Sequence, residues 1–139
     1  MAIFVCTKDD ISDLVRLDKK CFDRGEAFPR KLIENHFNSG TKIYRIEVGS
    51  FKFAAVFYMD RQVTETHVAS IGVDPKFRGK GLGHVIMKRI LRWKRPIVLE
   101  VRITNIPAIG LYEKYGFVKY GYLKNHYPDG SDAHKMILL

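Results

Sequence analysis

Three glycines at alternate positions, Gly79, Gly81 and Gly83, separate a run typical of a β-strand from a run typical of a helix. Residues 66–73 (THVASIGV) form the strand run, and apolar residues recur at helical spacing over residues 82–93. Alternate glycines let the backbone turn without side chains in the way, and its N–H groups then point outward at the positive end of a helix. The sequence therefore predicts either a pyrophosphate-binding loop or a glycine turn without a ligand.

Two common nucleotide-binding motifs do not fit this loop. A Walker A loop needs GxxxxGK followed by Ser or Thr, and a GxGxxG fingerprint needs a third glycine where Ile86 stands. The next strand run, residues 97–103 (IVLEVRI), is nearly all apolar, so we expect it to be buried on both faces. Strand, helix and strand in this order favour a right-handed βαβ crossover.

Two helices are expected in the first part of the chain. Apolar residues recur at helical spacing over residues 10–22, and Asp9 or Asp10 can cap the start of this helix. We expect a break at Gly25 and a second helix over residues 29–40, since proline favours a first helical turn.

Runs rich in β-branched and aromatic residues on either side of Gly49-Ser50 predict a hairpin. Asn105 can cap a later helix that Gly116 ends, and residues 117–123 and 133–139 are predicted to be the closing strands. The resulting order, ααβββαβαββ, describes one α/β domain over residues 1–139, with a mixed central sheet flanked by helices.

Composition is that of an ordinary globular domain. The 139 residues are 46% hydrophobic and 28% charged, so long disordered segments are not expected. No apolar run approaches the roughly 18 residues of a transmembrane helix. The first apolar run is too short for a signal peptide, and acidic residues follow it at once, so we expect a cytoplasmic protein. Cys6 and Cys21 lack CxxC spacing and a nearby His pattern, which predicts buried free thiols and no metal site.

The net charge of +9 is concentrated in one segment. Between Pro75 and Leu99 the chain has no acidic residue and eight basic ones: Lys76, Arg78, Lys80, Lys88, Arg89, Arg92, Lys94 and Arg95. Such a segment suits a phosphate-bearing partner, which can be nucleic acid, a membrane surface or a nucleotide cofactor. A solvated basic helix face is the plainer alternative.

The segment VDPKFRGKGLG, the basic helix after it and LEVRITNIPAIGLYEKYGF resemble the acetyl-CoA signature of the GNAT superfamily of N-acetyltransferases. LEVR, the Asn of TN, A-I-x-LY, GF and the terminal DGSDAHKM make the chain most similar to ribosomal-protein-alanine N-acetyltransferases and their archaeal and eukaryotic N-terminal acetyltransferase relatives. The motifs keep the family's order over residues 67–138, and the first half matches only in outline. The resemblance implies a GNAT-like domain that uses acetyl-CoA and no metal.

In the family, backbone amides of the glycine loop grip the CoA pyrophosphate, and here the basic residues gather around that loop. The cofactor-binding residues that the resemblance implies are Ile71, Gly72, Val73, Arg78, Gly79, Lys80, Gly81, Leu82, Gly83, His84, Asn105 and Tyr112. A helix cap explains Asn105 equally well. Tyr112 matches the tyrosine that protonates the departing CoA thiolate, although without the resemblance it would be taken as a core residue.

Glu100 is the expected catalytic base. A lone carboxylate within a central strand is costly unless it is paired with Arg or Lys or used in the reaction. The substrate amine must be neutral to attack the thioester of acetyl-CoA directly. A peptide α-amino group has a pKa of about 7.7–8.0, so a modest base is sufficient to remove its proton. The matching family residue, Glu or His, removes this proton, often through a water. His67 and Glu26 match further polar family positions and are secondary candidates.

The resemblance implies that the substrate lies between the loop that joins the first two helices and the loop before the last strand. The substrate-binding residues that it implies are Glu26, Phe28, Pro29, His126 and Tyr127. The second loop usually carries two adjacent tyrosines in the family. Since His126 replaces the first of them, we expect a changed preference for the first residue of the substrate.

We therefore expect an acetyl-CoA-dependent N-acetyltransferase that acts on protein or peptide N-termini, by direct transfer through a tetrahedral intermediate, with Glu100 as base and Tyr112 as acid. Acetylation of a lysine side chain or a small amine is the alternative, and a lysine pKa of about 10.4 demands more from the base. A non-enzymatic nucleic-acid-binding module is a remote alternative, because the basic segment lacks a stacking platform. The ribosome or an auxiliary subunit stays open as a partner; a membrane or a specific nucleic acid is not expected.

Overall fold

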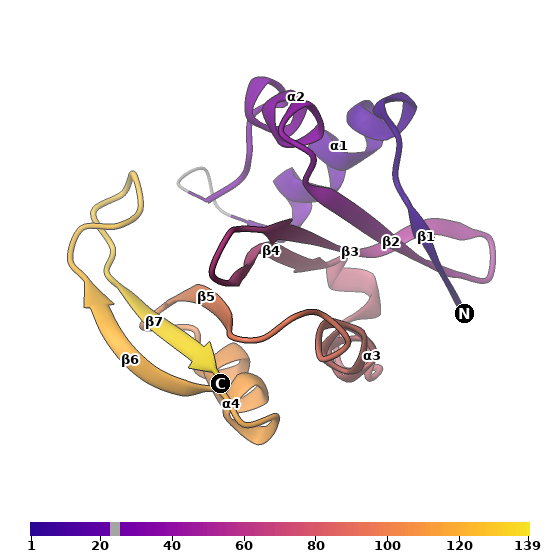
Figure 1. Cartoon of the computed structure of the whole chain (residues 1–139). Helices are drawn as coiled ribbons and strands as arrows, with labels where there is room; N and C mark the ends of the chain where they lie inside the picture. The colour runs from indigo at the N-terminus through magenta and orange to yellow at the C-terminus, as the bar shows by residue number, and fades with distance from the viewer. Residues whose placement is uncertain (23–25) are drawn as a thin grey trace.

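The computed structural model describes residues 1–22 and 26–139, which form a seven-stranded sheet with helices on both faces (Figure 1). The strands are β1 (Ala2–Val5), β2 (Lys42–Val48), β3 (Phe51–Arg61), β4 (Thr66–Val73), β5 (Ile97–Arg102), β6 (Val118–Leu123) and β7 (Ala133–Leu138). The helices are α1 (Ile11–Cys21), α2 (Arg30–Asn38), α3 (Leu82–Ile90) and α4 (Ile106–Lys114), with short 3-10 turns at Lys8–Asp10 and Pro75–Phe77. The expected α/β fold with a mixed, helix-flanked sheet is confirmed.

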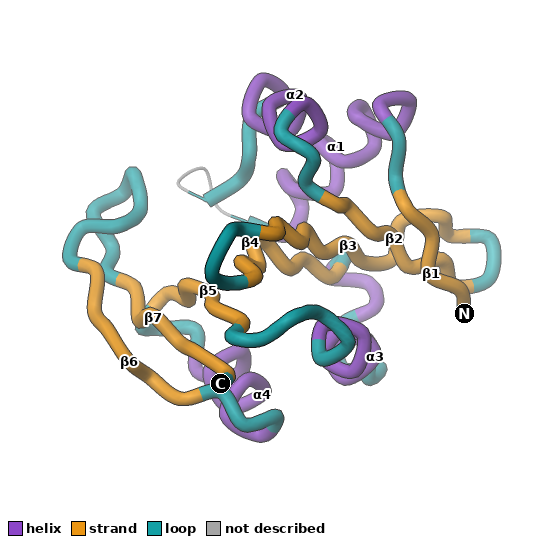
Figure 2. The backbone as a smooth tube through the Cα atoms, viewed as in Figure 1, coloured by secondary structure: helices purple, strands orange, loops and turns teal. Residues whose placement is uncertain are grey.

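The strand order is β1-β2-β3-β4-β5-β7-β6, and only the β4–β5 pair is parallel. Its register runs from Thr66 opposite Ile97 to Val68 opposite Leu99, and beyond these residues the strands separate (Figure 2). The second half of β4 and the end of β5 therefore face each other across a gap in the sheet. The residues that border this gap, 71–73 of β4 and Arg102 of β5, line the site described below.

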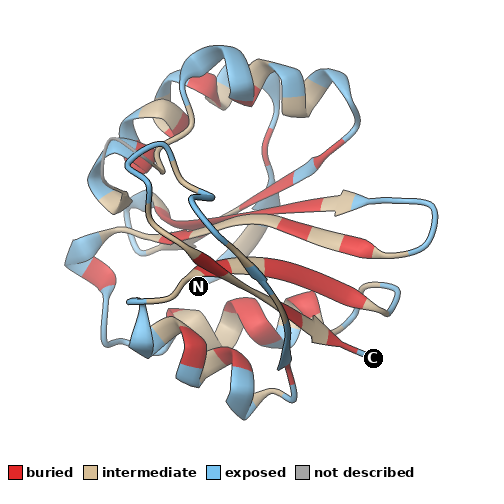
Figure 3. Cartoon of the chain, turned by 90° about the vertical axis from the view of Figure 1, so that its left-hand side faces the viewer, coloured by how far each residue is buried: buried red, intermediate tan, exposed pale blue. Residues whose placement is uncertain are grey.

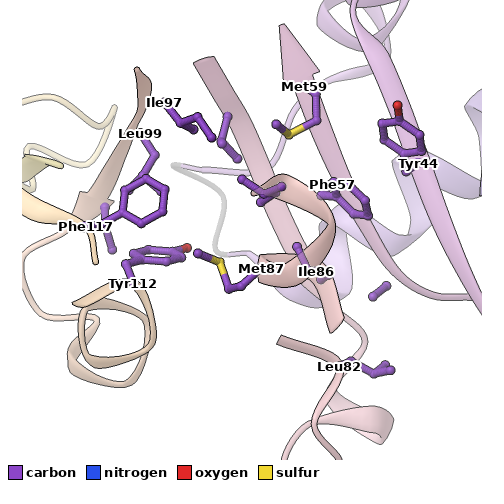
Figure 4. Close-up of a cluster of buried hydrophobic side chains, with 14 of the residues drawn as sticks. Tyr44, Phe57, Met59, Leu82, Ile86, Met87, Ile97, Leu99, Tyr112 and Phe117 are labelled. Atoms are coloured by element: carbon purple, nitrogen blue, oxygen red, sulfur yellow. The ribbon is translucent and has the colours of Figure 1, made fainter. Parts of the chain in front are cut away.

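Two apolar clusters hold the helices against the sheet. The buried residues of helices and strands lie where the two layers meet, and the exposed residues lie on the outer faces of the helices (Figure 3). On one face, residues of α3 and α4 pack against β2 to β5 and β7, with Phe57, Ile86, Met87, Leu99 and Tyr112 among them (Figure 4). On the other face, α1 and α2 cover β2 and β3 through Leu14, Leu17, Ile33, Val56 and Tyr58. Burying each large aliphatic side chain contributes about 1.5–3 kcal/mol. None of the described helices is long and apolar enough to cross a membrane.

Two elements differ from the sequence prediction. β1 was not predicted, because its four residues are too few to show a period and only Ile3 is not exposed; it pairs antiparallel with β2. The predicted helix over residues 82–93 ends three residues early, at Ile90. The N–H groups of Arg92 and Trp93 bond to carbonyls three residues back, at 3.1 and 2.9 Å, and this tighter turn ends the helix.

The cap of α1, the burial of Cys21 and the burial of β5 also differ from the sequence prediction. Asp10 occupies the N-cap of α1 but makes no side-chain cap; its carboxylate instead accepts the N–H of Thr7 at 2.8 Å. Cys6 is buried as expected, whereas Cys21 is only partly buried. β5 is not buried on both faces, since Glu100 and Arg102 are partly exposed on one of them. The predicted break at residue 25 lies outside the described residues.

Candidate active site

A cavity of about 1000 Å³ lies between the second half of β4, the loop before α3, and α4. Eleven of the twelve predicted cofactor residues line it: Ile71, Gly72, Val73, Arg78, Gly79, Gly81, Leu82, Gly83, His84, Asn105 and Tyr112. Lys80 does not line the cavity; it is exposed, and its Nζ atom lies 5.6 Å from the centroid of the Phe77 ring. The volume lies within the range of sites that enclose small molecules and cofactors.

The glycine loop leaves its own surface open. Gly79 and Gly81 have positive φ angles of +75° and +84°, and a Cβ atom at either would meet nothing within 4 Å. Gly81 is also the N-cap of α3, where free N–H groups and the helix dipole favour an anion. Gly83 has a different role, because a Cβ atom there would lie 2.9 Å from Leu111 of α4. The loop thus fits a pyrophosphate, and Gly83 allows close packing of α3 on α4.

Arg78 fixes the loop to its surroundings. Its Nε atom donates to the carbonyl of Val73, and its Nη2 atom donates to the carbonyl of Cys21, each at 3.2 Å. These bonds connect the loop before α3 to the end of β4 and to α1. Arg78 therefore contributes both positive charge and rigidity to this side of the cavity.

Tyr112 lies on α4, is 8% exposed and lines the cavity. Burial raises the pKa of its phenol well above the usual value, and nearby Tyr127 and Glu26 raise this pKa further. The hydroxyl therefore stays protonated at neutral pH and is able to donate. Asn105 caps the same helix, since its Oδ1 atom accepts the N–H of Ala108 at 3.3 Å.

Glu100 and His67 contact each other. Their Oε1 and Nε2 atoms are 2.8 Å apart, and the side chains are 23% and 24% exposed. The hydrogen bond to Glu100 raises the pKa of His67 above its usual value, against the opposing effect of burial. Glu100 is therefore paired, but with a histidine rather than with the Arg or Lys that its position suggested. Neither side chain lines the cavity.

The sequence reasoning missed Arg102 as a site residue, although its place on β5 two residues after Glu100 was a usable signal. Its Nε atom donates to Glu26, and its Nη1 atom donates to Ser131 and, at 2.8 Å, to Asp129. Both Arg102 and Glu26 line the cavity. The Ser131 N–H and the Arg102 guanidinium together lower the pKa of Asp129 to about 2.

The predicted substrate residues fall into two groups. Glu26 lines the cavity, whereas Phe28, Pro29, His126 and Tyr127 do not. Phe28 packs inward, 5.2 Å from the ring of His36 and 5.5 Å from that of Tyr58, and its N–H donates to Asp18 at 3.0 Å.

The other three lie nearer the surface. Pro29 and His126 are exposed, and Tyr127 is partly buried. The ring of His126 lies 4.8 Å from that of Tyr127. Burial raises the pKa of Tyr127 to about 12, and the charge of Glu26 contributes to this shift. The charge of Glu26 thus raises the pKa of both Tyr112 and Tyr127.

Within residues 1–22 and 26–139, no group of three or more His, Cys, Asp or Glu side chains is arranged to hold a metal ion.

The sequence profile of the acetyltransferase (GNAT) family matches residues 19–117, and the chain belongs to this family. The expected family and the expected acetyl-CoA-dependent N-acetyltransferase class are thereby confirmed. The chain is 30% identical to the N-alpha-acetyltransferase of Sulfolobus acidocaldarius, over 96% of this chain and 89% of that protein. It is 29% identical to the ribosomal protein bS18-alanine N-acetyltransferase of Salmonella typhimurium, over 84% and 82%.

A solved structure extends the similarity to the fold. Ard1 from Thermoplasma volcanium matches with a TM-score of 0.84 and 27% sequence identity, over 99% of this chain and 97% of that chain.

Proposed function

We propose that this protein transfers the acetyl group of acetyl-CoA to the N-terminal α-amino group of proteins or peptides. The observation that carries the proposal is the cavity, because the glycine loop, the buried side chain of Tyr112 and the loop residue Glu26 all line it. The names of the relatives support an N-terminal amine as the acceptor. We also propose that the protein acts in the cytoplasm.

Cofactor binding is assigned to the glycine loop and α3. Acetyl-CoA supplies an activated thioester when it is bound. N–H groups at the start of α3 would hold the pyrophosphate, and the open surface of Gly79 and Gly81 would let phosphate oxygens approach the backbone. Asn105 and residues 71–73 line the same cavity and would hold the arm that leads to the thioester.

Tyr112 acts on the leaving group. Its protonated hydroxyl donates a hydrogen bond to the sulfur as negative charge develops there. Because burial raises the pKa of Tyr112, its proton stays on the phenol until the sulfur becomes negative, and transfer of that proton to the sulfur would then release the CoA thiol.

Glu100 accepts the proton of the attacking amine. Because Glu100 does not line the cavity, the proton passes through a water rather than directly. His67 orients the carboxylate through the 2.8 Å hydrogen bond. Glu26 is the less favoured base, since its partner Arg102 stays charged at every working pH, whereas the partner of Glu100 is a histidine.

The acceptor is tested with two matched peptides. A peptide with a free N-terminus and no lysine is expected to be acetylated at pH 7.5 at least about 10²-fold faster than an N-terminally blocked peptide with one lysine. The reason is that the neutral fraction of an amine of pKa about 8 exceeds that of a lysine by about this factor. Mass spectrometry of the products locates the acetyl group. Preferred acetylation of the blocked peptide, or of a small polyamine, would contradict the proposal.

The cofactor assignment is tested with Gly81→Glu. The variant is expected to lose measurable acetyl-CoA binding by calorimetry, because a carboxylate enters the phosphate-binding surface. Gly40→Glu is the matched control: Gly40 has nearly the same φ (+87° against +84°) and equally open space, but it does not line the cavity. The control is expected to bind normally. Undiminished affinity in folded Gly81→Glu would remove the loop from the site.

A further inference from the structure

Arg102 joins two loops that are far apart in sequence. From its position at the end of β5, it binds Glu26 in the α1–α2 loop and Asp129 and Ser131 in the β6–β7 loop. Its guanidinium carbon also lies 4.5 Å from the centroid of the Tyr127 ring. A single side chain thus contacts both segments that were expected to enclose the acceptor.

The chemistry of these contacts requires arginine. The guanidinium donates in two directions at once, from Nε towards one loop and from Nη1 towards the other, and it presents a flat face to an aromatic ring. A lysine ammonium has the same charge but lacks this planar fork. The Arg102 and Glu26 side chains are only 14% and 22% exposed, so their contact is largely shielded from competing water, whereas the Asp129 side chain is 45% exposed.

The β6–β7 loop meets Arg102 as an ordered turn. The N–H of Tyr127 bonds to the carbonyl of Ser131, and the N–H of Gly130 bonds to the carbonyl of Tyr127. The Asp129 carboxylate also accepts the N–H of Ser131 at 3.0 Å. Because the turn holds itself together, contacts at Asp129 and Ser131 dock the whole loop, including Tyr127.

Two described residues of the α1–α2 loop, Glu26 and Phe28, make polar contacts that hold it in place. Glu26 is bound by Arg102, and the Phe28 N–H is bound by the Asp18 carboxylate, which is 1% exposed. The Asp18 contact lies within the α1–α2 cluster, whereas the Arg102 contact connects the loop to β5. Of these two contacts, the one with Arg102 links residue 26 to the opposite side of the site.

We propose that Arg102 is a positioning residue that couples the α1–α2 and β6–β7 loops, so that both walls of the acceptor site form together on β5. Arg102 and Glu100 lie two residues apart on the same face of β5. Docking of the loops therefore also sets their position relative to the proposed base. The inference rests on the proposed function for the identity of the acceptor, but the coupling of the loops is independent of it.

The test is Arg102→Lys, with kinetics and hydrogen exchange measured on the same preparation. The KM for the acceptor peptide is expected to rise at least about tenfold, while the KM for acetyl-CoA changes by less than about twofold. Amide exchange at Phe28 and at Ser131 is expected to accelerate together, and exchange at Val56 in β3 should not change. Arg16→Lys is the matched control, because the ion pair that Arg16 forms with Asp13 is exposed and Arg16 does not line the cavity.

Asp129→Asn gives a second, milder variant. It removes one charged partner of Arg102 at the surface, so the same pattern is expected with a smaller rise in the acceptor KM. Faster exchange in one loop alone, or an equal rise of both KM values with a lower Tm, would overturn the coupling. If the acceptor proves not to be an N-terminus, the exchange measurement still decides the inference. Conversely, unchanged exchange with intact peptide acetylation would reject only the role of Arg102.

Discussion

Replacing Tyr112 by phenylalanine is expected to lower kcat by about 10²–10⁴ and to leave the affinity for acetyl-CoA nearly unchanged. The ring fills the same space against Phe117, whose centroid is 6.1 Å away, so packing is preserved. What is lost is the hydroxyl of a cavity-lining residue, which burial keeps protonated. Steady-state kinetics and calorimetry on the purified variant measure the two quantities.

Tyr120→Phe is the matched control for this prediction. Tyr120 is an exposed residue of β6 that contacts Lys135, and it does not line the cavity. Its kcat is expected to stay close to that of the unmodified protein. A Tyr112→Phe variant with normal kcat would leave Tyr112 as a core residue.

Glu100→Gln is expected to reduce activity at neutral pH by about 10²-fold or more, since glutamine keeps the shape of the side chain but cannot accept the amine proton. The loss is expected to shrink as the pH rises above about 8, where the α-amino group of the substrate is already neutral. A pH–rate profile of the variant and of the unmodified protein measures this difference.

The stability of the same variant separates catalysis from ion pairing. Because Glu100 raises the pKa of His67, their pair stabilises the fold below the unfolded histidine pKa of about 6.5, and this contribution disappears as the pH rises through the folded pKa. The Tm difference between the two proteins should therefore be largest at acidic pH. Since both side chains are about one-quarter exposed, the loss should fall below the roughly 3–5 kcal/mol typical of a broken buried pair.

Titration of His67 by NMR completes the experiment. In Glu100→Gln its pKa should fall, because the opposing effect of burial remains. Glu65→Gln is the control, since Glu65 contributes least among the groups that raise this pKa. A large loss of stability together with near-normal kcat would exclude Glu100 and leave His67 and Glu26 as the candidate bases.

Local patterns account for the parts of the fold that the sequence predicts well. The Asn105 cap, the turn at Gly49 and the change of period at the glycine loop each depend on a few neighbouring residues. The end of α3 depends instead on how the chain turns towards β5, and β1 depends on pairing with β2 about forty residues later. Such elements carry little signal of their own.

The candidate site shows the same division. The glycine loop is contiguous, so its position beside a cavity follows from a short motif. The contact of Arg102 with Glu26 spans 76 residues, and the contact of His67 with Glu100 spans 33. The parallel pairing of β4 with β5 brings His67 next to Glu100. The folding of the α1–α2 loop onto β5 brings Glu26 next to Arg102. A strand pattern alone does not predict either partner.

The partly buried Cys21 has a consequence for side reactions. It lines the cavity proposed to hold a thioester, and a thiolate there would be able to take the acetyl group by exchange. Burial raises the pKa of this thiol to about 11, so only about one molecule in 10⁴ carries the thiolate at pH 7. We therefore expect Cys21 to resist acetylation by a thioester bound in this cavity.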